Sequence, residues 1–150
     1  MVRIAAALAS VALFGSAQAA QQPSAATLYQ EFDLFGSWAP NCAAAPSLDN
    51  PHVTVAANGL HVLERDDFGS GYETNRYDIV AAKRMDRDRL AVDVWFAQAG
   101  AAPQRQLIII RIEKHTRRTM FTGTADGPPR VKDGIAVAAG KPTPVLNKCD

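Results

Sequence analysis

The chain has few of the residues that usually carry catalytic or metal chemistry. Only 2 cysteines and 3 histidines occur in its 150 residues. The histidines show none of the H-x-H, H-x-x-x-H or H-E-x-x-H spacings that indicate a metal site. The chain also lacks the G-x-S-x-G of nucleophile-elbow hydrolases and the G-x-x-x-x-G-K of phosphate-binding loops. These absences predict no catalytic residue, no metal site and no cofactor.

Long apolar runs and an excess of charge are also missing beyond the N-terminus. The most apolar later run, Leu107 to Ile110, is interrupted by Arg111, so we expect no transmembrane segment after the first 19 residues. Without Arg3, the 15 remaining lysines and arginines balance the 15 aspartates and glutamates. This even balance gives no reason to expect a nucleic-acid partner, which usually requires a basic face.

The N-terminus has the pattern of an export signal. Arg3 precedes an apolar stretch over residues 4–14, and Ala17-Gln18-Ala19 matches an A-x-A cleavage site. We therefore predict a signal peptide over residues 1–19 and a mature chain of 131 residues (150 minus 19). The mature protein is expected to be exported, either to the periplasm or as a secreted protein.

The two cysteines lie near the two ends of the mature chain. An oxidising compartment favours a Cys42–Cys149 disulfide. It would close a loop of 107 residues (149 minus 42), for which the chain-entropy model gives about 4–5 kcal/mol. A reactive cysteine would need a neighbouring base, and neither cysteine has one. We predict a leader with a short helix over 20–34 and one disulfide-closed domain over 35–150.

Strand patterns and short turns make up most of this domain. We expect strands over 52–57, 60–66, 74–85, 90–97, 107–113, 119–123 and 135–138, followed by a rigid tail to Cys149. Asn58-Gly59 predicts a type I′ hairpin turn between the first two. No helical pattern long enough for a crossover separates the strands, which favours antiparallel neighbours. The fold class is therefore mainly β: an antiparallel meander closing into a small barrel, or alternatively a two-sheet sandwich.

Alternation predicts which side chains face the core. The inward set is Leu90, Val92, Val94 and Phe96 on one strand, Ile108, Ile110 and Ile112 on the next, and Tyr77, Ile79 and Ala81 on a third. Trp95 then faces outward. The helix expected over 23–33, with Ser24 as its cap, has an apolar face that we expect to cover Trp95. An exposed patch for a partner is the alternative.

Candidate contacts for a ligand or partner are the aromatic residues Trp38, Tyr72, Tyr77 and Trp95. An enzymatic site could be assembled only from scattered groups, namely His61, Glu73, Tyr77 and His115. The acidic stretch over 66–73 departs from the calcium-loop spacing and is expected to be a surface loop. Basic residues near successive turns are expected to be solvated, with an anion site as the minority option: Lys83, Arg84, Arg87, Arg89, Lys114, Arg117 and Arg118.

Two sets of short segments lie at the two ends of the mature chain: Gly36-Ser37-Trp38, Cys42, Pro46-Ser47 and Asn50-Pro51-His52, then Lys132-Asp133-Gly134, Gly140-Lys141-Pro142-Thr143-Pro144 and Cys149. In these segments the chain resembles an uncharacterised family of small exported bacterial proteins. This resemblance implies a domain linked between its ends and implies no activity. The G-x-W of Gly36 and Trp38 also resembles lipocalin-like barrels and small periplasmic barrel inhibitors. That resemblance implies that Trp38 plugs one end of a barrel.

Three hypotheses for function follow from these patterns. The first is a non-enzymatic binding module of the cell envelope that holds a small apolar ligand or a protein partner. The second is an enzyme built on the scattered histidine, glutamate and tyrosine residues named above. The third is a purely structural envelope protein. The inside of the expected barrel distinguishes them, because only a ligand-binding module requires a cavity there.

Overall fold

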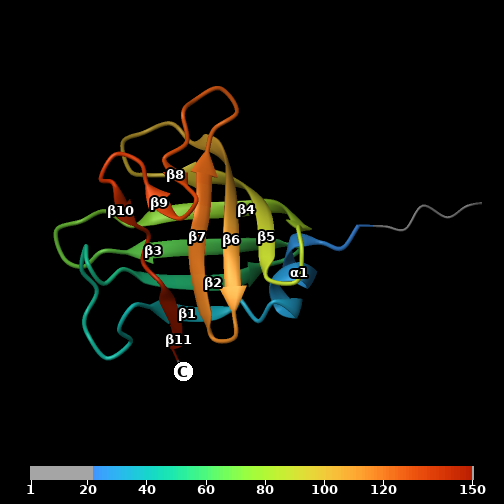
Figure 1. Cartoon of the computed structure of the whole chain (residues 1–150), viewed down its shortest axis with the longest axis horizontal. Helices are drawn as coiled ribbons and strands as arrows, with labels where there is room; N and C mark the ends of the chain where they lie inside the picture. The colour runs from blue at the N-terminus through green and yellow to red at the C-terminus, as the bar shows by residue number, and fades with distance from the viewer. Residues whose placement is uncertain (1–21, 150) are drawn as a thin grey trace, which may run out of the picture.

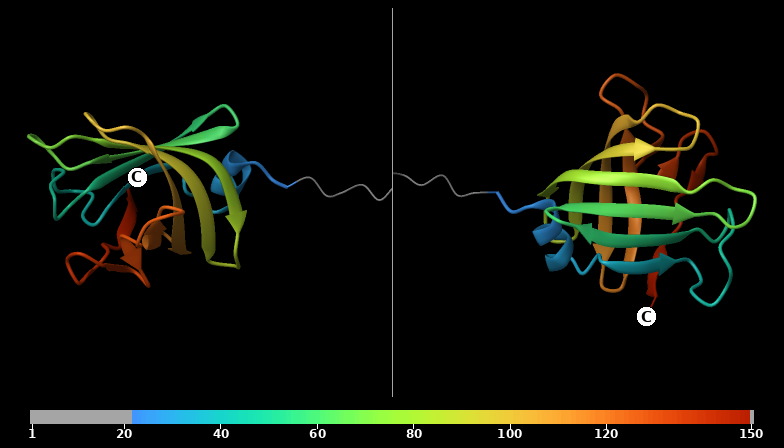
Figure 2. Two further views of the ribbon diagram at one scale, coloured as in Figure 1. Left: turned by 90° about the horizontal axis from the view of Figure 1, so that it is seen from above. Right: turned by 180° about the vertical axis from the view of Figure 1, so that it is seen from behind.

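Eight antiparallel strands close into a barrel, and a short helix lies at one of its ends (Figures 1 and 2). The computed structural model describes residues 22–149, so the expected signal peptide over 1–19 lies outside the described residues. The elements are α1 Ala25–Glu31, β1 Gly36–Ala39, β2 His52–Asn58, β3 His61–Asp67, β4 Asn75–Arg84, β5 Arg89–Ala97, β6 Gln104–Glu113, β7 Thr116–Gly123, β8 Val131–Lys132, β9 Ile135–Ala136, β10 Lys141–Pro142 and β11 Leu146–Cys149. The strand order is β7-β11-β1-β2-β3-β4-β5-β6, and β6 pairs back onto β7. The predicted antiparallel barrel is confirmed.

Strand β7 has two different neighbours along the edge that faces away from β6. Near its start, Thr116 and Arg117 pair with β11. Near its end, Thr122 pairs with Val131 of β8, and β9 and β10 continue this small sheet outside the barrel (Figure 1). The segment over 146–149 was expected to be a tail, and this expectation is wrong. It is strand β11, and it completes the barrel between β7 and β1.

The barrel interior follows the predicted alternation, except where a bulge shifts it. Leu90, Val92 and Val94 of β5 are buried, as the alternation predicts. On β4 the register shifts between Ile79 and Ala81. A bulge adds one residue to a strand and so moves the following side chains to the other face. For this reason Ala82, and not Ala81 as predicted, packs against the core.

The hairpin between β2 and β3 is confirmed, although its turn differs from the expected one. Asn58 pairs with His61, so Gly59 and Leu60 are the two central residues of the turn. Only Gly59 of these has a positive φ, at 62°. A type I′ turn needs positive φ at both central positions, whereas a II′ turn needs it only at the first, where glycine is favoured. The turn therefore lies one residue later than predicted and follows the II′ pattern.

Helix α1 closes one end of the barrel. Ser24 caps it, because its hydroxyl accepts a hydrogen bond from the Thr27 amide at 3.1 Å. Its apolar face, with Leu28 and Tyr29, is fully buried against β3 and β4. The expectation that this face covers Trp95 is wrong. Trp95 lies near the far end of β5 and stays 44% exposed, because the helix packs at the opposite end of the strands.

Two contacts fix the chain ends at the seam between β1 and β11. Trp38 of β1 is buried, and its indole N–H donates to the Leu34 carbonyl at 2.9 Å. The predicted Cys42–Cys149 disulfide is present, with 5.5 Å between the two Cα atoms. Asn50 holds the irregular segment between β1 and β2 by donating to the carbonyls of Asn41, Ala44 and Ala45. The start and the end of the domain are thus joined at one place.

Candidate functional site

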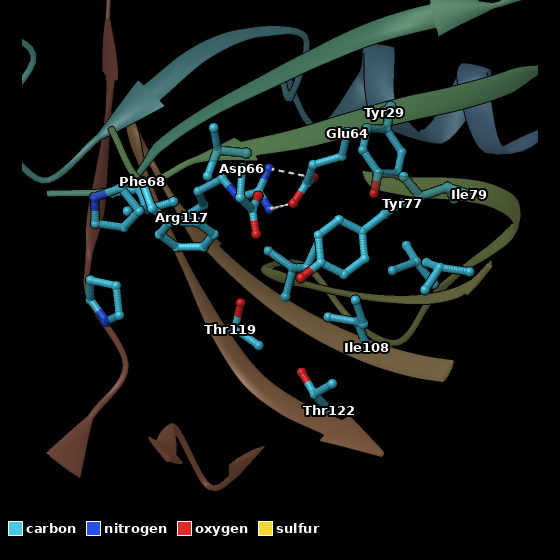
Figure 3. A pocket seen from close by; sticks show the side chains of 17 residues that line it. Tyr29, Glu64, Asp66, Phe68, Tyr77, Ile79, Ile108, Arg117, Thr119 and Thr122 are labelled. Atoms are coloured by element: carbon cyan, nitrogen blue, oxygen red, sulfur yellow. Dashed lines mark hydrogen bonds and ion pairs between the residues drawn. The ribbon is translucent and has the colours of Figure 1, made fainter. Parts of the chain in front are cut away.

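A partly open cavity of about 190 Å³ lies inside the barrel (Figure 3). It extends from Tyr29 of α1 toward the opposite rim, where Pro51 and Phe68 flank β2 and β3. Its wall is made by Tyr29, Pro51, Val53, Glu64, Asp66, Phe68, Tyr77, Ile79, Val92, Val94, Ile108, Ile110, Arg117, Thr119, Thr122, Pro144 and Leu146. Most of these are apolar residues of the barrel core. The charged residues among them define the chemistry of the cavity.

Glu64 and Arg117 form a buried ion pair across the barrel. The two guanidinium nitrogens Nη1 and Nη2 of Arg117 donate to the two carboxylate oxygens of Glu64 at 2.9 and 2.8 Å. Their side chains are 4% and 10% exposed for Arg117 and Glu64 respectively. Burial by itself lowers the pKa of Arg117, but the attraction and hydrogen bonds of Glu64 outweigh burial and raise it. The charges of the two side chains therefore offset each other within this bidentate ion pair.

Strand alternation places both partners inside. On β3, Glu64 shares a face with the buried Val62, since side chains two apart point the same way. Arg117 lies opposite Ile112 of β6, another core residue. The expectation that Arg117 is a solvated turn residue is wrong, because β7 begins at Thr116, three residues earlier than the expected strand over 119–123. A charged residue in phase with core residues on a strand was the signal that could have located this pair.

Asp66 is the second acid on the inner face of β3. The expectation that it belongs to a surface loop is wrong, because β3 continues through Asp67. Its Oδ1 atom is buried and has no hydrogen-bond partner within residues 22–149. Burial, followed by the negative charge of Glu64, raises the pKa of Asp66 to about 7, against opposing effects of Arg117 and the side chains of Tyr77 and Asn75. Near neutral pH this carboxyl therefore changes its charge.

Two tyrosines bring hydroxyl groups into the same space (Figure 3). Tyr29 of α1 is fully buried, and its hydroxyl has no partner among the residues that the structure describes. Tyr77 of β4 accepts a long hydrogen bond of 3.5 Å from Asn75. Burial and the nearby acids raise the pKa of both tyrosines. Both hydroxyls therefore keep their protons at neutral pH and can donate as well as accept.

The remaining wall is apolar. The interior positions Tyr77, Val92, Val94, Ile108 and Ile110, expected from alternation, all line the cavity. They surround the cavity without filling it, so the barrel is not packed solid here. Thr119 and Thr122 of β7, the strand next to β6, add two hydroxyls to the wall. The cavity therefore combines an apolar wall with a few fixed polar groups, which is the usual composition of a small-ligand site.

The four aromatic contact candidates are not brought together. Tyr77 lines the cavity, and Trp38 is buried outside the lining, at 5.9 Å between its ring and the Arg117 guanidinium carbon. Tyr72 is 55% exposed in the loop after β3, and Trp95 is exposed on the outer face of β5. Sequence reasoning thus identified one of the lining aromatic residues. It missed Tyr29, which is not part of the apolar face proposed for the helix.

The other sequence candidates are also dispersed. His61 begins β3, whereas Glu73 lies beyond the far end of that strand, and both are exposed. His115 is exposed in the turn between β6 and β7, so Tyr77 lies in the cavity without the other three. Several of the basic residues near turns are paired: Arg84 with Glu31, and Arg89 with Asp86. In the part of the chain described, no group of three or more metal-ligating side chains is found.

No family model, curated protein or solved structure matches this chain. The site must therefore be interpreted from its own geometry. Within residues 22–149, no helix has the length and apolar character to span a bilayer. The cavity lining contains carboxyl, guanidinium, phenol and threonine hydroxyl groups and no histidine or cysteine. This set of groups can orient a bound molecule and balance its charge.

Proposed function

We propose that this chain is an exported, non-enzymatic binding protein of the cell envelope whose barrel cavity holds a small ligand. The observation that carries the proposal is the cavity of about 190 Å³, lined by apolar side chains and a few fixed polar groups. An apolar cavity of about 150 Å³ accommodates benzene. The proposed ligand is therefore a compact molecule, slightly larger than a single six-membered ring.

Support for export comes from the N-terminal pattern and from the disulfide. The A-x-A site after an apolar stretch is typical of a cleaved signal peptide. The Cys42–Cys149 bond requires an oxidising compartment to form and persist. The resemblance of Gly36 and Trp38 to lipocalin-like barrels agrees with a binding role inside a barrel.

A protein partner on the outer surface has weaker support. Trp95 and Leu107 are the exposed apolar residues on the outer face of β5 and β6. Asp93 and Arg105 lie between them and form an ion pair. This interleaved charge interrupts the apolar surface, so a ligand inside the barrel is the function that we favour.

Three probes of similar size test the proposal: toluene, benzyl alcohol and benzylammonium. Binding is measured by ligand-detected NMR on the oxidised mature protein. We expect at least one probe to bind the wild type. The variant Ile108→Phe should abolish binding, because the added ring fills the cavity.

Leu107→Phe is the matched control for this experiment. Leu107 neighbours Ile108 on the same strand but is 45% exposed on the outer face, so the added ring does not enter the cavity. Circular dichroism verifies that both variants keep the β-sheet spectrum. The proposal is refuted if none of the three probes binds the wild type, or if Leu107→Phe and Ile108→Phe weaken binding equally.

A further inference from the structure

The cavity contains one negative charge without a balancing positive charge. Five titratable side chains face it: Tyr29 from α1, Glu64 and Asp66 from β3, Tyr77 from β4 and Arg117 from β7. Glu64 and Arg117 cancel each other in the bidentate pair. Both tyrosines are neutral. Among the described residues that line the wall there is no further cation, so the ionised form of Asp66 leaves the cavity with a net charge of −1.

The polar atoms that remain available also favour a donor. Asp66 Oδ1 and the Tyr29 hydroxyl are both buried without a hydrogen-bond partner within the described residues. Buried polar atoms of proteins almost always have a partner, so each unpaired atom calls for an explanation. A bound hydrogen-bond donor would satisfy the carboxylate oxygen of Asp66. An ammonium group carries three donors and no acceptor.

An anionic ligand is disfavoured by the same geometry. Arg117 is the one cation of the lining, and both terminal nitrogens of its guanidinium are already engaged by Glu64. A carboxylate or phosphate entering the cavity would also meet the negative charges of Glu64 and Asp66. In a site shielded from water, this repulsion is stronger than it would be at the surface.

Given the binding role proposed above, we propose that the ligand is a small organic cation, a protonated amine on a compact apolar or aromatic body. Its ammonium group donates to Asp66 Oδ1. Its apolar body packs against Val92 and Val94 of β5 and Ile108 of β6. The unpaired acid thus contacts the charged group of the ligand, and the apolar wall contacts its body.

A proton competes with this ligand for Asp66. The pKa of Asp66 is raised to about 7, by burial first and by Glu64 second. Below that pH the carboxyl is neutral, and the cavity no longer attracts a cation. Affinity for an amine that stays protonated should therefore fall as the pH drops from 8 to 6, by at most about tenfold per unit below the pKa.

Calorimetric titrations of the oxidised mature protein compare benzylammonium with benzyl alcohol, which has the same ring and nearly the same size. At pH 8 we expect benzylammonium to bind at least about tenfold more tightly, since hydrogen bonds to an ionised group are about twice as strong as neutral ones. Its affinity should drop at pH 6, whereas that of benzyl alcohol should change little. This comparison uses the wild type alone and does not depend on the folding of a variant.

Asp66→Asn should remove the preference for benzylammonium while benzyl alcohol still binds, which also shows that the cavity is intact. Asp67→Asn is the matched control, because it makes the same charge change at an exposed neighbouring position. Equal affinities of the wild type for benzylammonium and benzyl alcohol at pH 8 would overturn the inference. A preference for benzylammonium that persists in Asp66→Asn would also overturn it. Binding of toluene or benzyl alcohol alone overturns it and leaves the proposed binding role standing. Binding of no probe overturns both.

Discussion

The barrel interior has two kinds of region, built on opposite principles. Around Leu28, Trp38 and Leu90, apolar side chains fill the space, and each of the three is at most 2% exposed. Around Glu64, Asp66 and Arg117, inward-facing side chains surround a cavity of about 190 Å³. Close packing of apolar groups stabilises the first region through burial. The second region keeps desolvated charges, which stabilise a fold only when every partner is in place.

The difference shows where this chain accepts a cost in stability. Buried charges and an unpaired hydroxyl raise the free energy of the folded state. The packed apolar region and the disulfide lower it relative to the unfolded chain. Proteins tolerate such groups mainly where they serve a ligand or a reaction. The contrast between the packed region and the charged region can be tested by substitutions at three positions. The first substitution should change the stability of the protein most.

Arg117→Met should have the largest effect on stability. It removes the one partner that Glu64 has within residues 22–149 and leaves that carboxylate buried beside Asp66. Breaking a buried pair in this way typically costs about 3–5 kcal/mol. The free energy of unfolding in urea measures the loss. The double variant Glu64→Leu with Arg117→Met should recover much of it, because both desolvated charges are then absent.

Arg105→Met is the control for that experiment. Arg105 also pairs with an aspartate, Asp93, but its side chain is 62% exposed. Exposed pairs contribute little, so the unfolding midpoint should barely move. Equal losses for Arg105→Met and Arg117→Met would contradict the distinction between the buried and the solvated pairs.

Asp66→Asn should stabilise the protein in a pH-dependent way. The folded-state pKa of Asp66, about 7, lies above the ordinary value of 3.8. Between these two pH values the folded protein keeps a proton on Asp66 that the unfolded chain has released. The wild type therefore loses stability as the pH rises from about 4 to 7, by at most about 4 kcal/mol. The variant lacks this loss.

Unfolding free energies at pH 5 and pH 8 give the measurement for Asp66→Asn. The gain over the wild type should be small at pH 5 and larger at pH 8. Asp67→Asn, at the exposed neighbouring position, should show no such trend. A gain that is equal at both pH values would show that the carboxyl does not titrate in this range.

Tyr29→Phe should give the smallest effect and a stabilising one. The Tyr29 hydroxyl is buried without a partner among the described residues, so its removal eliminates a desolvation penalty of about 1 kcal/mol. Thermal unfolding measures the change. Tyr72→Phe, at a position 55% exposed, is the control and should leave the midpoint unchanged. A destabilised Tyr29→Phe would mean that the hydroxyl does have a partner in solution.

Much of the apolar core could be predicted from the sequence. The alternation of Leu90, Val92 and Val94 located β5, and Ser24 located the start of α1. These signals are local, because they depend only on the period of a strand or on the cap of a helix. Closure through β11 was not predicted, since a four-residue segment after Pro144 has no strand pattern of its own and pairs with partners distant in sequence.

The charged region around the cavity was less predictable for a related reason. Glu64 and Arg117 are 53 residues apart, and charged residues are expected to be outside unless a specific partner is known. Alternation with Val62 indicates that Glu64 faces inward, but its pairing with Arg117 depends on which strands meet across the barrel. The bulge after Ile79 likewise moves Ala82 inward in place of Ala81. Neither the meeting of these strands nor the bulge has a signal in a single sequence.

The disulfide at the β1–β11 seam also changes what a protease can do to this protein. Cys42 and Cys149 are 107 positions apart, and every barrel strand except β1 lies between them or ends at the second of them. A single cut in an exposed connection, such as the one between β5 and β6, opens this covalent ring but releases no fragment. Two cuts, or a reductant, are needed before any strand of the ring can leave. After a first nick the covalent ring therefore still holds all of its strands together.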